Sequence, residues 1–327
     1  MRICVIGAGA MGGSFAALLD RAGHQVDVVD TWAEHVAAIN ADGLYMNGAL
    51  GEHTAKVPAS TVPTETAFAD WVIVFTDSNN TVQAAETVAS VLAPSGCVIT
   101  MQNGIGNVEA LCERLGTERV VGGSSMCSAA SDGAGKVHFT HHVYTTIGEL
   151  DGQDSARIQA LAELLRSAGL TINIDPNITS KIWSKFLLNC GVNALCAVTG
   201  QRVGEMARVP ELYAMQDRVI DEALQVTQAK GIELQDPDVR TTIKKACYYK
   251  FNKPSMLQHV TVGKRTEIDA INGALVREAR ALGIPTPYNE ALVALLKGRE
   301  TQRMQEVAGE TIDYDAWEAR IKGDPLP

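Results

Sequence analysis

The sequence lacks several features that mark other classes of protein. It has no run of about 18 uninterrupted apolar residues, the length needed to cross a bilayer. Its opening segment, residues 1–10, holds only a short apolar run that glycines interrupt, unlike the core of a secretory signal peptide. We therefore expect no membrane partner, and we interpret the opening segment as the first strand of the fold.

Closely spaced cysteine ligands are also missing. The seven cysteines of this 327-residue chain lie far apart, without a C-x-x-C pair, and most sit in apolar runs. This pattern indicates neither a disulfide framework nor a zinc site. His138, His141 and His142 are close in sequence, but no cysteine or carboxylate set accompanies them. We predict no metal site and a reducing, cytoplasmic location.

Positive charge is scarce in the first half of the chain. The net charge is −10, and residues 1–176 contain 8 Lys and Arg against 19 Asp and Glu, whereas residues 177–327 contain 20 against 19. Nucleic acids and anionic membranes are bound through basic patches. The charge therefore argues against nucleic acid as a partner and favours a small molecule.

The first half of the chain does contain a regular alternation of strand-like and helix-like segments. Strands separated by helices predict right-handed βαβ units and a parallel sheet. The expected strands are 2–7, 26–29, 71–75, 97–101 and 119–122, and the helices between them include 14–22, 81–92 and 108–115. A strand-rich stretch at 137–150, one helix and one last strand lead to Pro176.

Beyond Pro176 the sequence predicts helices only. The expected helices are 181–198, 211–230, 239–250, 266–282 and 289–298, separated by glycine and proline. Residues 301–327 are expected to form a polar tail with Trp317 as an anchoring aromatic. We place the domain boundary at Pro176, so that residues 1–176 form one domain and residues 177–327 a second.

A glycine-rich turn follows the first predicted strand and precedes a helix. It consists of Gly7, Ala8, Gly9, Ala10, Met11 and Gly12 and matches G-x-G-x-x-G. The glycines permit a tight turn, the approach of a pyrophosphate and close packing of helix on strand. The helix N-terminus attracts phosphate without basic side chains. The pattern predicts a dinucleotide site in a Rossmann-type doubly wound sheet, with a plain glycine turn as the alternative.

Asp30 ends the second predicted strand. An acidic side chain at this place can accept hydrogen bonds from the adenine ribose hydroxyls. A 2′-phosphate would instead need a basic neighbour, and no Lys or Arg occurs between Arg21 and Lys56. Asp30 therefore favours NAD over NADP, and the alternative is that it only caps the following helix.

One predicted helix carries a line of polar side chains in an apolar setting. Lys185, Asn189 and Asn193 recur every four residues and so share one face. The pattern favours the lining of a cleft, and a solvated stripe is the alternative. A lysine in a desolvated cleft has a lowered pKa, which lets it exchange a proton with a carbonyl or alcohol oxygen.

Together these residues resemble the ketopantoate reductase (2-dehydropantoate 2-reductase) family over about the first 300 positions. The other motifs that carry the resemblance are Gln102-Asn103-Gly104-x-Gly106, Asn252-x-x-Ser255-Met256-Leu257-Gln258 and Thr266-Glu267-Ile268-Asp269. The resemblance implies a nucleotide-binding domain followed by an all-α domain for substrate binding and dimerisation. It also implies a homodimer with the substrate between the domains.

The resemblance also assigns roles to individual residues. Lys185 matches the general acid, and Glu267 matches the carboxylate that grips the substrate or orients that lysine. Asn103 matches the position beside the nicotinamide. The residues that match the family's binding site for a carboxylate substrate are Asn189, Asn193, Asn252 and Ser255.

Four positions depart from the family pattern. Thr31 and Asp77 stand where members that use NADP have Arg and Lys, which strengthens the prediction of NAD. Ala194 and His259 replace the usual Pro and Asp near the substrate region, so the identity of the substrate stays open.

The sequence thus predicts an NAD(H)-dependent oxidoreductase that transfers a hydride between nicotinamide and a 2-oxo or 2-hydroxy acid. Reduction of 2-dehydropantoate to pantoate is one candidate reaction. Two alternatives stay open at this point. One is an NAD-linked dehydrogenase for another hydroxy acid or alcohol, and the other is a non-catalytic Rossmann protein that senses NAD(H).

Overall fold

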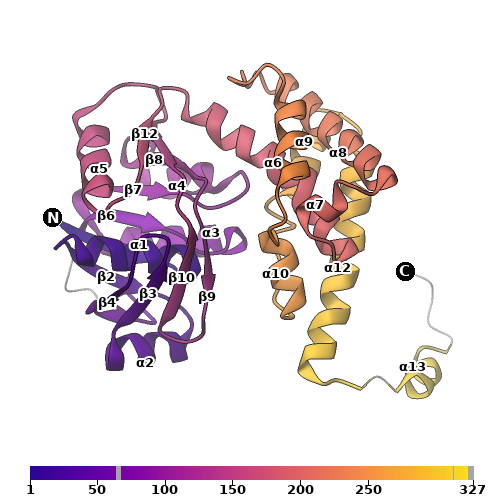
Figure 1. Ribbon diagram of the computed structural model, residues 1–327, viewed down its shortest axis with the longest axis horizontal. Coiled ribbons are helices and arrows are strands. Elements are labelled where there is room, and N and C mark those ends of the chain that lie inside the picture. Colours follow the sequence, from indigo (N-terminus) through magenta and orange to yellow (C-terminus); the bar gives the residue numbers. More distant parts are fainter. Residues whose placement is uncertain (64–67, 312, 323–327) are drawn as a thin grey trace.

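A computed structural model describes residues 1–63, 68–311 and 313–322. It has an N-terminal α/β domain and a helical C-terminal domain, which lie side by side (Figure 1). The helix α6 (Ile178–Thr199) leads from one domain into the other. The predicted fold class, a doubly wound sheet followed by helices, is confirmed. The expected boundary at Pro176 falls between the last strand and α6.

The larger sheet has eight strands in the order β12-β11-β8-β7-β6-β1-β2-β5. Only the β8–β11 pair is antiparallel among these neighbours. The strands are β1 (Arg2–Ile6), β2 (Gln25–Val29), β5 (Ala59–Ser60), β6 (Ala69–Val74), β7 (Leu92–Thr100), β8 (Val120–Ser125), β11 (Thr145–Glu149) and β12 (Ile172–Ile174). The chain moves outward from β1 in both directions, and ligands of doubly wound sheets bind at the carboxyl ends of strands beside such a point.

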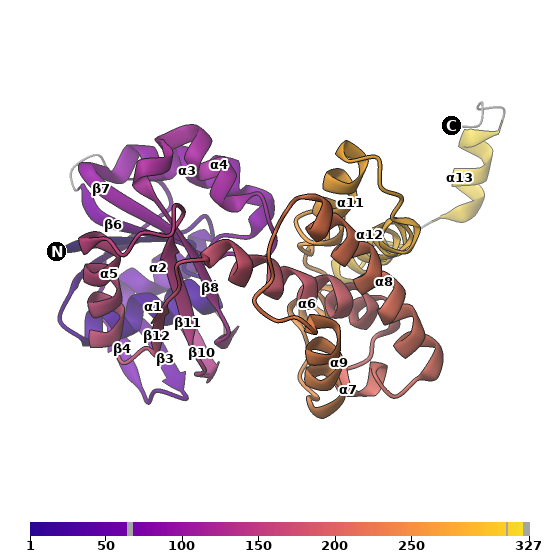
Figure 2. The same cartoon turned by 90° about the horizontal axis from the view of Figure 1, so that it is seen from above.

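Helices cover both faces of this sheet (Figure 2). Buried side chains of α1 (Ala10–Arg21) and α5 (Ala156–Ser167) share one core with the sheet, and those of α3 (Thr81–Val91) and α4 (Asn107–Leu115) share the other. The helix α2 (Ala33–Asp42) follows β2. Two short 3-10 turns, η1 (Ser78–Asn80) and η2 (Thr117–Arg119), precede α3 and β8.

The N-terminal domain also contains a second sheet that the sequence analysis missed. Its order is β4-β3-β10-β9, formed by β3 (Leu44–Gly48), β4 (His53–Ala55), β9 (Ser128–Ser131) and β10 (Lys136–His141). Leu44 and Phe139 of this sheet belong to the same buried core as Phe15 of α1. The helix α1 is therefore packed between the two sheets. Its surroundings explain why it is apolar on more than one side.

The C-terminal domain is built around α6. Buried side chains of α6 pack with those of α8 to α12 in one core. The remaining helices are α7 (Val203–Met206), α8 (Pro210–Ala229), α9 (Val239–Tyr249), α10 (Ser255–Thr261), α11 (Asn272–Ala281), α12 (Pro287–Ala308) and α13 (Tyr314–Ile321). By length and composition alone α6 could cross a membrane, but 61% of its most apolar stretch is buried inside the protein, as in a core helix.

Two expectations for the C-terminal half were wrong. The helix predicted at 266–282 begins only at Asn272. The Thr266 Oγ1 accepts a hydrogen bond from the backbone N–H of Ile268, at 3.2 Å. A local side-chain bond of this kind competes with helix formation. The segment before Asn272 is therefore an irregular turn.

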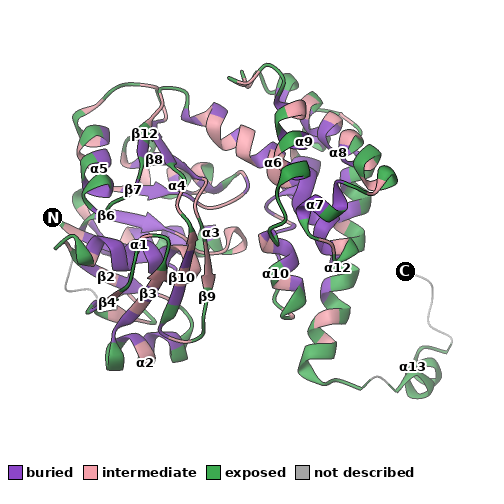
Figure 3. Ribbon diagram, in the orientation of Figure 1, coloured by how far each residue is buried: buried purple, intermediate pink, exposed green. Residues whose placement is uncertain are grey.

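The polar tail predicted for 301–327 is the second error. The helix α12 continues through this region to Ala308 and ends at Gly309, which adopts a left-handed φ of 69°. The helix α13 follows, lies apart from both domains and has no buried residue (Figures 1 and 3). Trp317 is 48% exposed, so it is not an anchor. Residues 312 and 323–327 lie outside the described part of the chain.

Candidate active site between the two domains

The three glycines of the predicted dinucleotide turn have three different surroundings. A Cβ on Gly7, whose φ is +86°, would lie 2.7 Å from the Thr76 backbone nitrogen, and a Cβ on Gly12 would lie 1.9 Å from the Gly7 carbonyl oxygen. A Cβ on Gly9 would meet nothing within 4 Å. The turn is thus tightly packed at both ends and open in the middle, at the N-terminus of α1. This shape fits a pyrophosphate held by backbone N–H groups.

The other residues of the turn connect it to its surroundings. The backbone N–H of Ala8 donates to Asp30 Oδ2 at 2.7 Å. Ala10 begins α1, and Met11 packs against the core of the domain. Asp30 therefore lies directly beside the turn, as expected of a residue that contacts the same ligand.

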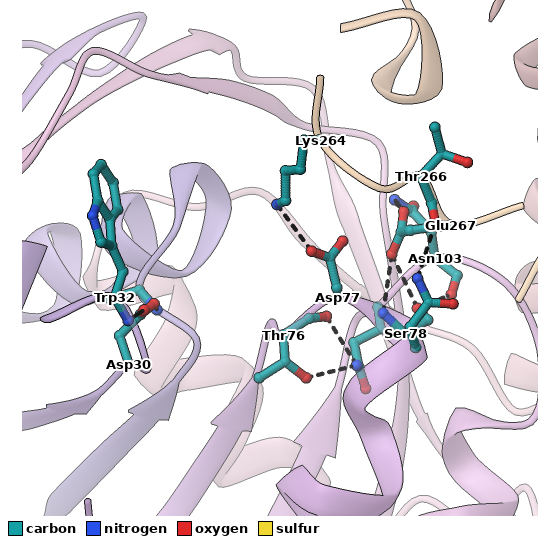
Figure 4. Close-up of polar contacts among 12 residues, drawn as sticks. Asp30, Trp32, Thr76, Asp77, Ser78, Asn103, Lys264, Thr266 and Glu267 are labelled. Carbon is teal, nitrogen blue, oxygen red and sulfur yellow. Dashed lines mark hydrogen bonds and ion pairs between the residues drawn. The ribbon is translucent and has the colours of Figure 1, made fainter. Parts of the chain in front are cut away.

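Asp30 does not cap the next helix. Its Oδ1 accepts from the backbone N–H of Trp32 at 2.8 Å, and Trp32 itself is the N-cap residue of α2, without a capping side chain. Figure 4 shows Asp30 and Trp32 together at the end of β2. The carboxylate is half-buried, which leaves it accessible to a ribose.

Glu267 of the C-terminal domain is bound by groups of the N-terminal domain. Its Oε1 lies 3.2 Å from both the backbone nitrogen and the Oγ of Ser78, and its Oε2 lies 3.0 Å from Asn103 Nδ2 (Figure 4). Only 5% of Glu267 is exposed. Two predicted site residues, Asn103 and Glu267, are thus in direct contact across the domain boundary. Ser78 belongs to no motif and was missed.

Three further contacts join the domains around Glu267. Asn79 Nδ2 donates to the carbonyl oxygen of Thr266 at 2.9 Å, and Lys264 Nζ pairs with Asp77 Oδ2 at 2.9 Å (Figure 4). A Cβ on Gly104 would lie 2.3 Å from the carbonyl oxygen of Ala270, so only glycine permits this approach of the two backbones. The positive partner of Asp77 therefore comes from the other domain, which the local sequence could not reveal.

Lys185 lies on α6 beside Asn103, and both side chains line the same small interdomain pocket. Burial lowers the pKa of the Lys185 ammonium to about 8, and the carboxylate of Glu267 and the thiol of Cys127 oppose this shift. Among the described residues, Lys185 Nζ has no hydrogen-bond or ion-pair partner. A half-buried amine with a pKa near neutrality and free donors is suited to proton exchange with a ligand.

The remaining predicted substrate residues have different degrees of burial. Asn189 is half-buried and Asn193 is 4% exposed, one and two turns along α6 from Lys185. This burial does not fit a solvated stripe. Ser255 is half-buried at the first position of α10, which packs against α6, and Asn252 lies in the exposed segment before it. No hydrogen bond within the described chain links the Asn252 or Ser255 side chain to α6.

His259, one turn after Ser255 on α10, contributes a neutral ring to the same region. Burial, followed by the nearby Lys264, lowers the pKa of its imidazole. Its Nδ1 is buried and has no hydrogen-bond partner among the described residues. The three histidines near position 140 have separate partners instead: His138 bonds to Asn47, His141 to Ser128 and His142 to the backbone of Thr171.

Comparison with known proteins gives consistent matches along the chain. The family model "Ketopantoate reductase PanE/ApbA" matches residues 3–152, and "Ketopantoate reductase PanE/ApbA C terminal" matches residues 177–300. The 2-dehydropantoate 2-reductase of Archaeoglobus fulgidus is 33% identical over 301 residues, which cover 92% of this chain and 98% of the relative.

Solved structures give the same result. A PanE/ApbA family ketopantoate reductase from Ralstonia eutropha JMP134 superposes with a TM-score of 0.86 at 32% identity, covering 93% of this chain and 99% of the other. D-mandelate dehydrogenase, solved with NADH and anilino(oxo)acetate, superposes with a TM-score of 0.87 at 29% identity over the same shares of the two chains.

Proposed function

The chain belongs to the ketopantoate reductase family, and from this premise we propose that it is an NAD(H)-dependent oxidoreductase that interconverts a 2-oxo acid and a 2-hydroxy acid. The observation that carries the proposal is the Lys185 amine, which is desolvated, has no partner within the described residues and lies beside Asn103 in an interdomain pocket. A structural lysine in such a place would be expected to have a carboxylate partner.

The N-terminal domain supplies the groups that would hold the cofactor. The open position at Gly9 would accept the pyrophosphate, and Asp30 would accept the ribose hydroxyls of NAD. Bound NADH would supply the hydride for the carbonyl carbon. Support for NAD rather than NADP comes from the acidic Asp30, and from the NADH named with D-mandelate dehydrogenase.

In this proposal Lys185 moves the proton. Its ammonium form donates to the ketone oxygen during reduction, and its neutral form accepts the hydroxyl proton during oxidation. A pKa of about 8 leaves the ammonium dominant near pH 7 and the amine dominant above pH 9. The protonation state of Lys185 near neutrality therefore favours reduction.

The substrate would be held by the groups that surround Lys185. Asn189, Asn193 and Ser255 would offer amide and hydroxyl donors to the carboxylate of the 2-oxo acid, and Asn252 lies three residues before Ser255. Glu267, which Ser78 and Asn103 hold in place, would contact the substrate without a direct ion pair to Lys185.

Two substrate classes follow from the comparisons. Relatives named 2-dehydropantoate 2-reductase support 2-dehydropantoate. The similarity to D-mandelate dehydrogenase supports a second candidate, a 2-oxo acid with a bulky apolar substituent. His259, a neutral ring in a position where the family has a carboxylate, favours the second candidate, because it removes a charge from the substrate region.

A substrate panel tests the proposal. Initial rates are measured in both directions with NAD(H) and NADP(H), using 2-dehydropantoate, phenylglyoxylate and small aliphatic 2-oxo acids. We expect turnover with NADH that Lys185→Ala lowers by at least about a hundredfold, the usual contribution of a general acid. Lys181→Ala, one turn earlier on α6 and paired with Asp175 at the surface, is the matched control.

Three outcomes would contradict the proposal. Unchanged turnover in Lys185→Ala removes the lysine from the mechanism. A strong preference for NADPH overturns the role given to Asp30. Tight NADH binding without turnover of any compound in the panel supports a non-catalytic sensor instead.

A further inference from the structure

An aromatic side chain stands at the edge of the dinucleotide site. Trp32 lies two residues after Asp30, and its backbone N–H donates to the Asp30 carboxylate. The indole is 40% exposed, although tryptophan is on average a highly buried residue. No motif in the sequence analysis assigned it a role. An exposed aromatic ring next to a carboxylate that is placed to bind the ribose is suited to contact the same ligand.

The indole is held in position by a buried ring. It stacks on His35 with 5.0 Å between ring centroids and 8° between ring planes. Both nitrogens of the fully buried His35 are occupied: Nδ1 accepts from the backbone N–H of Gly135, and Nε2 therefore carries the hydrogen and donates to the carbonyl oxygen of Ala8. The imidazole is thus fixed, and it connects Trp32 to the glycine-rich turn.

We propose that Trp32 is the stacking platform for the adenine ring of the dinucleotide. The inference rests on the proposed function, since it assumes that the ligand is NAD. The adenine base is attached to the ribose that Asp30 is placed to bind, so a ring two residues further along the chain is within reach of the base. Stacking a purine on an indole requires no charge and tolerates any orientation of hydrogen-bond donors.

The platform also contributes to the choice between NAD and NADP. A 2′-phosphate on this ribose would lie between a carboxylate and an apolar ring. The cations nearest in sequence are bound elsewhere: the Arg21 guanidinium donates to the Leu50 carbonyl at 2.6 Å, and the Lys56 ammonium donates to the Asp42 carbonyl at 2.7 Å. Figure 4 shows the third cation near the site, Lys264, paired with Asp77. The site therefore has no free cation for a 2′-phosphate among the described residues, and stacking of the adenine on Trp32 supplies binding energy in its place.

The competing explanation is that Trp32 only covers His35 and stabilises the turn. The two explanations differ in what they predict for ligands without adenine. If Trp32 is a platform, removing its side chain weakens the binding of ADP-ribose and leaves the binding of reduced nicotinamide mononucleotide unchanged. If Trp32 is only a structural cover, removing it weakens the binding of every ligand of the turn and lowers the melting temperature.

The experiment compares Trp32→Ala and Trp32→Phe with the wild type, by calorimetric titration with ADP-ribose and by KM for reduced nicotinamide mononucleotide. We expect Trp32→Ala to weaken ADP-ribose binding by about tenfold, since that is the usual effect of losing one base–aromatic stack. Trp32→Phe should recover most of the loss. The KM for the mononucleotide should stay at the wild-type value in both variants.

Tryptophan fluorescence gives a readout that does not depend on activity. ADP-ribose should quench the emission of the wild type and of the control Trp317→Ala, which removes the exposed indole of α13. The quenching should be absent from both Trp32 variants. Wild-type affinity for ADP-ribose in Trp32→Ala, or an equal loss for ADP-ribose and the mononucleotide, would overturn the inference.

The inference and the proposed function fail in distinguishable ways. If Trp32→Ala binds ADP-ribose normally while the wild type oxidises NADH with a 2-oxo acid, only the inference fails. If Trp32→Ala loses ADP-ribose selectively but no substrate is turned over, only the proposed reaction fails. If the wild type binds no ADP-ribose, both fail.

Discussion

At the scale of single residues, the proposed reaction depends on the protonation of Lys185. Because its pKa is lowered to about 8, kcat/KM for reduction should fall above pH 8 as the ammonium is lost. The value for oxidation should rise through the same pH, since the neutral amine is then the base. pH–rate profiles in both directions measure this, and parallel profiles would contradict it.

The same shift affects stability, in a direction that can be worked out. The unfolded chain holds this proton up to pH 10.5, whereas the folded chain releases it near pH 8. Between these values the unfolded state binds more protons, so this group makes the free energy of unfolding increase with pH. The free energy of unfolding of the wild type, relative to that of Lys185→Met, should therefore increase from pH 8 to pH 10, and urea titrations of both proteins at the two pH values measure this difference.

Two glycines of the same turn should respond differently to one added methyl group. Gly12→Ala places a Cβ 1.9 Å from a carbonyl oxygen, so it should destabilise the fold by about 1–3 kcal/mol, as overpacked cores do. Gly9→Ala meets no protein atom and has an ordinary φ of −58°, so stability should be unchanged.

The Gly9→Ala variant should differ from the wild type in cofactor binding rather than in stability. In Gly9→Ala the added methyl group enters the space proposed for the pyrophosphate, so NADH binding should weaken although the melting temperature does not change. Thermal melts and NADH titrations of the two variants separate these effects. Normal NADH affinity in Gly9→Ala would place the pyrophosphate elsewhere.

The places of several site residues in the fold could be predicted because each prediction rested on a local pattern. The glycine turn and the Lys185 line are set by short spacings, and their burial follows from the helix and strand that carry them. Ser78 and Lys264 could not be predicted, because their partners, Glu267 and Asp77, are about 190 residues away in sequence. No local signal indicates which domain face a side chain will meet.

At the scale of elements, α13 should contribute nothing to the stability of the fold. It buries no residue, and α12 before it is already ended by Gly309 (Figure 3). A chain that stops at Gly309 should therefore melt at the same temperature as the full chain. Glu300→Ala, in contrast, should lower the melting temperature.

Glu300 differs because it lies on the part of α12 that contacts the site. Its carboxylate is 8% exposed and accepts from the backbone N–H of Thr266 at 2.6 Å. Removing it leaves that buried donor unsatisfied, at a cost of about 1–3 kcal/mol. A truncated chain that melts as early as Glu300→Ala would show that α13 packs on the protein in solution.

The start of one helix and the presence of the second sheet were predicted wrongly for physical reasons. The residues after Thr266 are compatible with a helix, which is why the sequence predicts one there. In the structure, the Thr266 carbonyl oxygen instead accepts a hydrogen bond from Asn79 of the other domain, and its Oγ1 accepts one from the backbone N–H of Ile268. The small second sheet was missed because its strands are short and because β3 and β10 pair across about 90 residues of sequence. Strand pairing of this kind depends on tertiary structure.

At the scale of the whole molecule, Glu267 holds the two domains in register. Glu267→Ala would leave the donors of Ser78 and Asn103 without their partner, while Glu267→Gln keeps one acceptor for them. We expect the alanine variant to have a larger radius of gyration and faster amide exchange at Ser78. The glutamine variant should lie between it and the wild type.

Small-angle scattering and hydrogen exchange measure these changes without any substrate. Both variants should also lose activity, whether Glu267 contacts the substrate or only holds the domains together. The scattering result is therefore the one that tests the role of Glu267 between the domains. An unchanged radius in Glu267→Ala would show that the remaining contacts, including the Asp77–Lys264 pair, are sufficient to hold the domains together.

The packing of α6 limits how this protein could acquire a new substrate. A Cβ on Gly191 would lie 2.8 Å from the Ile220 side chain, and Cys190 is fully buried, so this part of α6 tolerates little change. The segment before α10 is exposed and carries fewer constraints. If the proposed function holds, a laboratory selection for a different 2-oxo acid should therefore accumulate beneficial substitutions near residues 251–259, while α6 persists unchanged as the inherited part of the site.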